Sequence, residues 1–122
     1  MTQYFRDRDG RPLTIVRGSA RTDRYHVHDL QGNPKDLTGA TECSFLLAAS
    51  PSAEALDLHL TLGNGVAHTS SDGAVVVEIS TAQTEALPLG ELWGELVIRD
   101  AAGTRDAIGG MVRVVDSLVT VP

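Results

Sequence analysis

The fold class is decided by residues 61–100, which read TLGNGVAHTSSDGAVVVEISTAQTEALPLGELWGELVIRD. At both ends of this stretch, aliphatic and polar side chains alternate with a period of two, the pattern of a half-buried β-strand. Between them, Ser80 or Thr81 can cap about one to two helical turns, and a Leu-Pro-Leu-Gly sequence ends the segment. The stretch therefore predicts strands bridged by one short helix.

The same alternation continues on both sides of this stretch, over residues 43–47, 56–62 and 108–114. The side chains expected to face the core are Cys43, Phe45, Leu47, Leu56, Leu58, Leu60, Leu62, Val75, Val77, Ile79, Leu92, Leu96, Ile98, Ile108, Val112 and Val114. Residues that favour tight turns, such as Gly63-Asn64-Gly65 and Asp72-Gly73, separate the runs. About seven short strands with frequent turns predict an all-β fold, an antiparallel sandwich or barrel.

Size and composition indicate a single acidic globular domain. The chain has 122 residues, of which 42% are apolar and 21% charged. A formal net charge of −6 without a basic block argues against nucleic acid as a partner. The N-terminal segment lacks the apolar core of a signal peptide, and no apolar run approaches the roughly 20 residues of a membrane span. We therefore expect synthesis in the cytoplasm and no membrane partner.

The two ends of the chain differ from its patterned middle. We assign residues 1–16 to an N-terminal arm or hairpin, residues 17–115 to a β-sandwich domain, and residues 116–122 to an apolar tail. The tail carries Leu118, Val119 and Val121 beyond the last patterned strand. Such a tail either completes a sheet edge or reaches a neighbouring molecule, and the sequence leaves both possibilities open.

The residue types that carry catalysis or bind metals form no recognisable site. His26 and His28 would share one strand face, but a metal also requires further ligands, and all four histidines alternate with expected core residues. Residues 7–10 resemble the start of a calcium loop that lacks its closing glutamate. Cys43 falls on an apolar face, and no nucleophile elbow surrounds Ser44. The sequence thus predicts no catalytic, metal or cofactor site, and no enzyme.

One strand departs from the pattern of a simple monomer. If Leu92 and Leu96 point inward, then Trp93 and Val97 point outward. An exposed tryptophan with aliphatic neighbours is a common anchor of protein–protein contacts. The alternative is that this strand is turned over, so that Trp93 packs in the core beside Gly94. We prefer the interface interpretation.

Several segments occur in a characteristic order along the chain. They are HDLQGNPKDLTGAT at 28–41, LGNGVAHTSSDGAVVVEIS at 62–80, TAQTEALPLGELWGELVIRDAAGT at 81–104 and GGMVRVV at 109–115. Together they resemble the immunoglobulin-like β-sandwich module of tailed-bacteriophage structural proteins, as in baseplate and other tail proteins. The chain departs from that pattern at Glu42, at Gly94 and in its first dozen residues. The first two departures leave the register of their strands open, and a one-residue slip would reverse every side chain.

The resemblance implies a non-enzymatic structural component of a virion, located in the tail, the baseplate or a connector. Such a module acts through contacts with other virion proteins, as a homo-oligomer or symmetric array. The residues expected to make these contacts are Trp93, Val97, Leu118, Val119 and Val121.

Two other functions remain as alternatives, a capsid decoration or cement protein and a carbohydrate-binding β-sandwich that recognises a host. One Trp, two Tyr and two Phe are few for stacking on sugars, so we rank the carbohydrate-binding alternative last.

Overall fold

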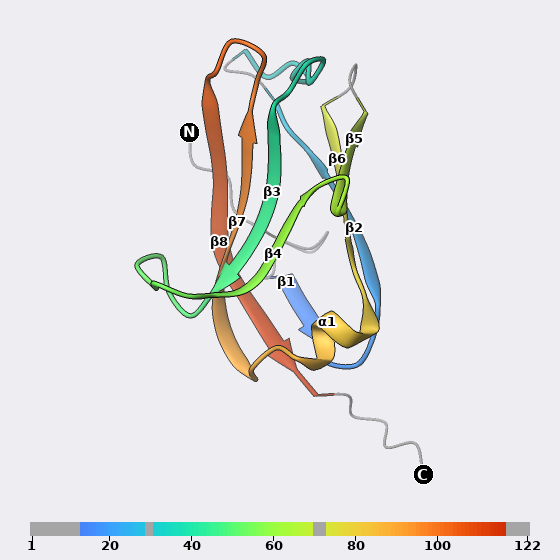
Figure 1. Cartoon of the computed structure of the whole chain (residues 1–122), viewed down its shortest axis with the longest axis vertical. Helices are drawn as coiled ribbons and strands as arrows, with labels where there is room; N and C mark the ends of the chain where they lie inside the picture. Colours follow the sequence, from blue (N-terminus) through green and yellow to red (C-terminus); the bar gives the residue numbers. More distant parts are fainter. Residues whose placement is uncertain (1–12, 29–30, 70–72, 117–122) are drawn as a thin grey trace.

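A computed structural model describes residues 13–28, 31–69 and 73–116, which form one curled sheet of eight strands (Figure 1). In chain order the strands are β1 (Leu13–Val16), β2 (Arg21–His26), β3 (Glu42–Ala48), β4 (Leu56–Leu62), β5 (Gly65–Thr69), β6 (Ala74–Ile79), β7 (Gly90–Arg99) and β8 (Arg105–Val115). The helix α1 (Thr81–Glu85) lies between β6 and β7. The predicted all-β class and the short bridging helix are confirmed.

The sheet is a half-barrel, whereas the sequence predicts a sandwich of antiparallel strands. Its strand order is β1-β8-β7-β3-β4-β5-β6-β2. β1 runs parallel to β8, and β4 meets β5 in a short parallel register, while the other neighbours are antiparallel. In Figure 1, β8, β7 and β3 form one wall, β5, β6 and β2 form the facing wall, and β4 crosses between them.

Two glycines explain why the sheet remains continuous where β4 passes into β5. Gly63 and Gly65 have φ angles of 82° and 97°, in the left-handed region that glycine enters at little cost. The Gly63 amide donates to the Val66 carbonyl at 2.9 Å, and the Asn64 amide donates to the Thr61 carbonyl at 2.8 Å. This tight turn lets β5 pair with the end of β4 and does not begin a separate sheet.

The two walls enclose one hydrophobic core. The predicted inward side chains of four strands are all buried, namely Cys43, Phe45 and Leu47 of β3, Val75, Val77 and Ile79 of β6, Leu92, Leu96 and Ile98 of β7, and Ile108, Val112 and Val114 of β8. Tyr25 of β2 stacks on Phe45 with ring centroids 6.5 Å apart, so the core joins the facing walls. The inward positions predicted for these four strands are confirmed.

β4 departs from the prediction at both of its ends. Leu58 and Leu60 are buried, but Leu56 and Leu62 are 48% and 41% exposed, so the prediction of four inward leucines is wrong. Leu58 pairs with Leu47 of β3, whereas Leu56 pairs with the next residue of β3, so the register shifts between these pairs. Such a bulge turns the residues beyond it to the opposite face of the sheet. Leu62 lies where β4 turns into β5.

The end of the half-barrel next to α1 is closed by Thr84, a fully buried helix residue. Its hydroxyl oxygen accepts the Gly18 amide at 3.1 Å and lies 3.1 Å from the Ser19 carbonyl and 3.0 Å from the Thr81 carbonyl. The predicted N-cap at Ser80 is confirmed, as a capping box with Gln83. The helix thereby holds the turn between β1 and β2.

The two edge strands of the half-barrel are joined by one side chain. Arg21 of β2 donates to the carbonyl oxygen of Thr14 in β1 and also forms a 2.7 Å ion pair with Asp23. β1 pairs with β8, so residues 13–16, which the sequence assigned to the arm or hairpin, belong to the sheet. The rest of the predicted arm, residues 1–12, and most of the predicted tail, residues 117–122, lie outside the described residues.

Candidate protein-contact site at Trp93

Trp93 lies on the outer face of β7 and is half-buried. Its neighbours Leu92, Leu96 and Ile98 are at most 5% exposed and belong to the core, so the strand is not turned over. The sequence prediction of an outward Trp93 is therefore confirmed, and the alternative of a core Trp93 is excluded.

The indole ring has a defined position on the sheet. Its Nε1 donates a 3.0 Å hydrogen bond to Glu95 Oε1, two residues along the same face of β7. A Cβ placed on Gly109 of β8 would lie 2.7 Å from the indole Cζ2, so the ring lies directly against the backbone at that glycine. Gly in a strand commonly marks such a close approach. Met111, the cross-strand partner of Trp93, lies beside it and is 43% exposed.

A small hollow adjoins the indole ring, and we call it the Trp93 socket. Its lining residues are Leu46, Ala48, Ser50, Pro51, Ala53, Leu56, Trp93 and Glu95. The loop between β3 and β4 projects from the body of the protein and supplies one side of the hollow (Figure 1). The register shift in β4 supplies Leu56, which is exposed on this face.

The size of the Trp93 socket restricts what it can hold. Its volume is about 60 Å³. That is roughly twice the ~30 Å³ share of one water molecule in the liquid. Small-molecule sites occupy about 300–1,000 Å³ and enclose most of their ligand. The socket therefore suits the end of one aliphatic side chain.

Val97 does not belong to this surface, and the prediction that it is exposed is wrong. It is 2% exposed and is the cross-strand partner of Ser44, which is 3% exposed. Leu56, which the sequence assigned to the core, instead lines the socket and is 48% exposed, and sequence reasoning missed it together with Pro51 and Ala53. The predicted contact residues Leu118, Val119 and Val121 lie outside the described residues.

A wider, open depression of about 490 Å³ lies at the Glu42 end of β3, and its polar groups bind one another. Arg99 Nε is 3.8 Å from Glu42 Oε1, and the Ser44 hydroxyl donates to Glu42 Oε2 at 3.3 Å. Burial, aided by the charge of Glu42, raises the pKa of the Cys43 thiol and disfavours a reactive thiolate. The partner of the Ser44 hydroxyl is thus the carboxylate of Glu42, whereas a nucleophile–base pair would place a histidine there.

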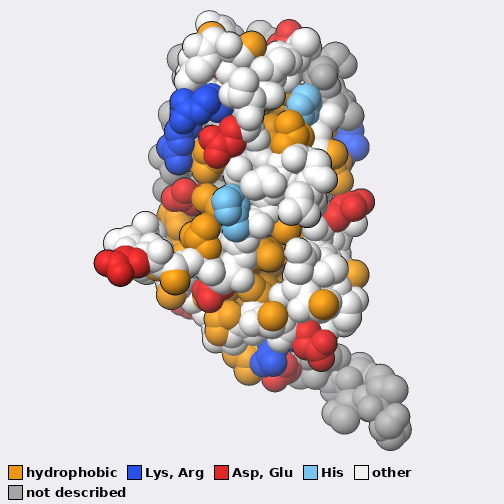
Figure 2. All heavy atoms as spheres, in the orientation of Figure 1, with side chains coloured by type: hydrophobic (Ala, Val, Ile, Leu, Met, Phe, Trp, Pro, Cys, Tyr) orange, Lys and Arg blue, Asp and Glu red, His pale blue; other side chains and the backbone are white. Residues whose placement is uncertain are grey.

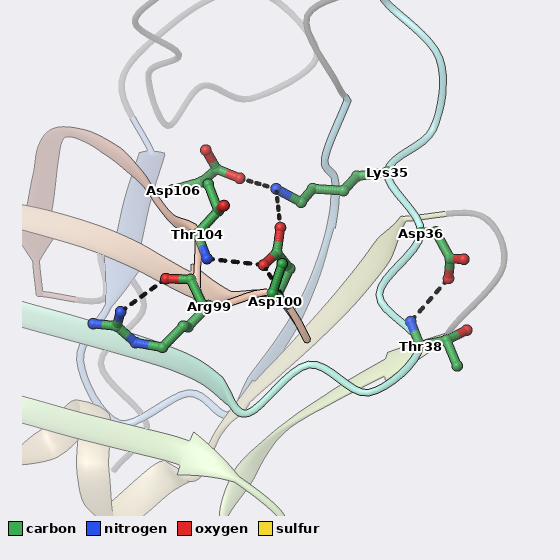
Figure 3. Close-up of polar contacts among 9 residues, drawn as sticks. Lys35, Asp36, Thr38, Arg99, Asp100, Thr104 and Asp106 are labelled. Atoms are coloured by element: carbon green, nitrogen blue, oxygen red, sulfur yellow. Dashed lines mark hydrogen bonds and ion pairs between the residues drawn. The ribbon is translucent and has the colours of Figure 1, made fainter.

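A separate cluster of polar side chains joins the loop that carries Lys35 to the β7–β8 hairpin (Figure 3). Lys35 Nζ lies 3.6 Å from Asp100 Oδ2 and also binds Asp106, from the start of β8. Asp100 Oδ1 accepts the amides of Thr104 and Ala102 at 2.9 and 3.0 Å. These bonds, the one from Thr104 foremost, hold the pKa of Asp100 below its ordinary value, and Lys35 adds to the effect. The arrangement is a structural clasp, since each charge has its partner.

The described residues can also be searched for a metal site and for a membrane-spanning helix. His26, His28 and His59 are exposed and His68 is half-buried. Within residues 13–28, 31–69 and 73–116, no three His, Cys, Asp or Glu side chains converge as metal ligands would. In the same part of the chain, no helix has the length and apolarity needed to cross a bilayer.

Figure 2 shows hydrophobic side chains gathered on the face of β3 and β4, below a charged group at its upper end.

Comparison with known proteins adds no relative: no protein-family model matches the chain, and no curated protein matches it. The function is therefore inferred from the residues and their geometry.

Proposed function

We propose that the protein is a non-enzymatic structural component of a tailed-phage virion, in the tail, the baseplate or a connector, and that it acts through protein–protein contacts. The observation that carries this proposal is the Trp93 socket. It joins the chain's only tryptophan to a small hollow that Leu46, Pro51 and Leu56 line on the outer face of a sheet. Binding energy in protein interfaces concentrates at such aromatic anchors and the pockets beside them.

Two exposed apolar side chains lie beside the socket, and the indole ring of Trp93 is held in place, which favours binding. Leu56 and Met111 are 48% and 43% exposed, and both adjoin Trp93. Removing apolar surface from water stabilises a complex by about 25 cal/mol per Å². Because the Glu95 hydrogen bond and the backbone at Gly109 already hold the indole, little side-chain entropy is lost on binding.

The shape of the sheet can be related to the immunoglobulin-like module that the sequence resembles. We propose that the half-barrel is a curled form of the immunoglobulin-like sandwich that the sequence resembles. Two facing walls enclose one core, as in a sandwich, and a short helix precedes the long strand β7, as the resemblance implies. The continuous passage from β4 into β5 would be the main difference from two separate sheets.

A capsid decoration protein remains the second candidate, because the same kind of contact would serve it. The carbohydrate-binding alternative is weaker. Of the three aromatic residues in the described part of the chain, Tyr25 and Phe45 stack on each other in or against the core. Only Trp93 lies on the outer face, whereas sugar sites generally need aromatic faces that are open to the ligand.

Quantitative mass spectrometry and antibody labelling of the purified phage particles that encode this chain test the proposal. A few to about a dozen copies, located at the tail or neck, would support it. Hundreds of copies spread over the shell would indicate the decoration protein. Absence from the particle would refute both, and binding on a glycan array would favour the carbohydrate alternative.

A matched pair of variants tests whether the socket is the contact site. Leu56→Ala should reduce incorporation into particles, because Leu56 lines the socket. Leu62→Ala removes a leucine of similar exposure, 41% against 48%, outside the socket, and should leave incorporation unchanged. Equal incorporation of both variants would argue against the socket.

A further inference from the structure

We propose that the Trp93 socket receives the side chain of Leu118 from a second copy of this chain. This inference rests on the proposed function, because it uses the same contact site and names its partner. The socket is one half of the contact, and the segment that follows β8 is the other.

The chemistry of the two halves is complementary. Six of the eight residues that line the socket have apolar side chains, among them Leu46, Pro51 and Leu56, while Ser50 and Glu95 add polar groups at its wall. Its volume of about 60 Å³ admits one aliphatic group. Residues 117–122 read SLVTVP, with three aliphatic side chains and no charged side chain, so they can approach Glu95 without repulsion. The preceding Asp116 has its own partner, Arg17, at 3.6 Å.

The last residue of β8 lies well away from the socket of its own chain. β8 passes Trp93 at Met111, the cross-strand partner, and ends at Val115. At about 3.3 Å per residue, the strand ends about 13 Å beyond the level of the socket. The ion pair with Arg17 holds Asp116 at this end of the sheet.

Leu118 is only two residues beyond Asp116 in the sequence. From Asp116 it can extend at most about 7 Å, because an extended chain spans no more than about 3.6 Å per residue. It therefore cannot reach the socket of its own chain, whereas it can enter the socket of a neighbour. The contact is accordingly one between two copies.

Such a contact joins two different surfaces of the same protein. A heterologous contact closes into a ring when the rotation between copies divides a full turn, and otherwise it extends into a filament. One side chain in a small socket binds weakly as a single pair. In a closed ring, each copy is held by two such contacts, and the effective concentration of neighbours strengthens the assembly.

Two full-length variants separate the halves. The tail variant carries Leu118→Asp, Val119→Asp and Val121→Asp and keeps the socket. The socket variant carries Trp93→Ala and keeps the tail, and it contains no tryptophan, because Trp93 is the only one in the chain. In a mixture, all tryptophan emission therefore comes from the socket of the tail variant.

We expect the emission of the tail variant to shift to the blue and to saturate as the socket variant is added. Because the mixture forms a single weak contact, analytical ultracentrifugation at high protein concentration should show a heterodimer, while each variant alone remains a monomer at that concentration. Adding Leu56→Ala to the tail variant should weaken this association about tenfold, since it removes a wall of the socket. A socket variant that also carries the three Asp substitutions should cause no shift.

A second socket variant protects the test against misfolding. Ala53→Arg fills the hollow, keeps Trp93 and replaces a partly buried loop residue. If both socket variants melt cooperatively and neither forms a heterodimer with the tail variant, the inference is overturned. The inference is also overturned if the emission shifts to the blue when the socket variant with the three Asp substitutions is added. If mixing fails while Leu56→Ala still impairs incorporation, the proposed function stands and another virion protein fills the socket.

Discussion

Replacing Thr84 by valine tests how the end of the half-barrel is held. Valine keeps the branched shape and removes the hydroxyl, so the Gly18 amide loses its acceptor and the nearby carbonyls lose a donor. A buried polar group left without a partner costs about 1–3 kcal/mol. Gly18 and Ser19 are exposed, so water can replace part of the lost bonding, and we expect about 1–2 kcal/mol.

For a domain of this size that loss corresponds to a melting temperature lower by about 4–8 °C. Thermal unfolding followed by circular dichroism at neutral pH measures it. Thr81→Val is the matched control, since Thr81 is an exposed residue of the same helix and its replacement should change stability by less than about 0.5 kcal/mol. The Gly18 amide should also exchange its hydrogen faster in the Thr84 variant. A Thr84→Val protein as stable as the wild type would refute this account of the closed end.

Three further predictions concern other parts of the sheet. Gly109→Ala should displace the Trp93 ring, because the new Cβ would lie 2.7 Å from the indole, and an unchanged fluorescence emission maximum would contradict this. Gly73→Ala should destabilise the protein more than Gly63→Ala in urea unfolding. Both glycines have positive φ, but only at Gly73 does the added Cβ meet backbone, at 2.4 Å, and equal losses would show that space is irrelevant there. The lowered pKa of Asp100 stabilises the fold above the ordinary carboxyl pKa, and this contribution is lost as the pH falls through the lower folded value. Asp100→Asn should therefore reduce the acid sensitivity of stability, measured by unfolding between neutral and strongly acidic pH, and an unaltered pH profile would count against the clasp.

The sequence predicted the strands whose pattern is set locally. In β6 and β7 a two-residue period places Val77 and Leu96 inside, and the same period places Trp93 outside. The period failed at Leu56, because the register shift arises from pairing with β3 and leaves no mark in the sequence of β4. The predicted exposure of Val97 failed because alternation assigns a side chain to a face and does not determine whether that face is covered.

The arrangement of the strands depends on contacts between distant residues. The parallel pairing of β1 with β8 joins Leu13 to Val112, and no local pattern indicates it. The single curled sheet likewise depends on how β5 meets β4 after the Gly63–Gly65 turn. In the candidate site, Trp93 could be predicted from alternation, whereas the wall formed by Pro51 and Ala53 required the path of a loop.

The parallel pairing of β1 and β8 has a mechanical consequence. β1 runs from Leu13 to Val16 beside Val112 to Val115, so the chain enters the pair at one end and leaves it at the other. Tension applied through the two termini would slide these strands past each other and load all their hydrogen bonds at once, so no single bond is peeled open first. The bond from the Arg17 amide to the Val115 carbonyl, at 2.9 Å, lies in the same load path. The parallel pair is therefore loaded in shear when the chain is stretched along its length.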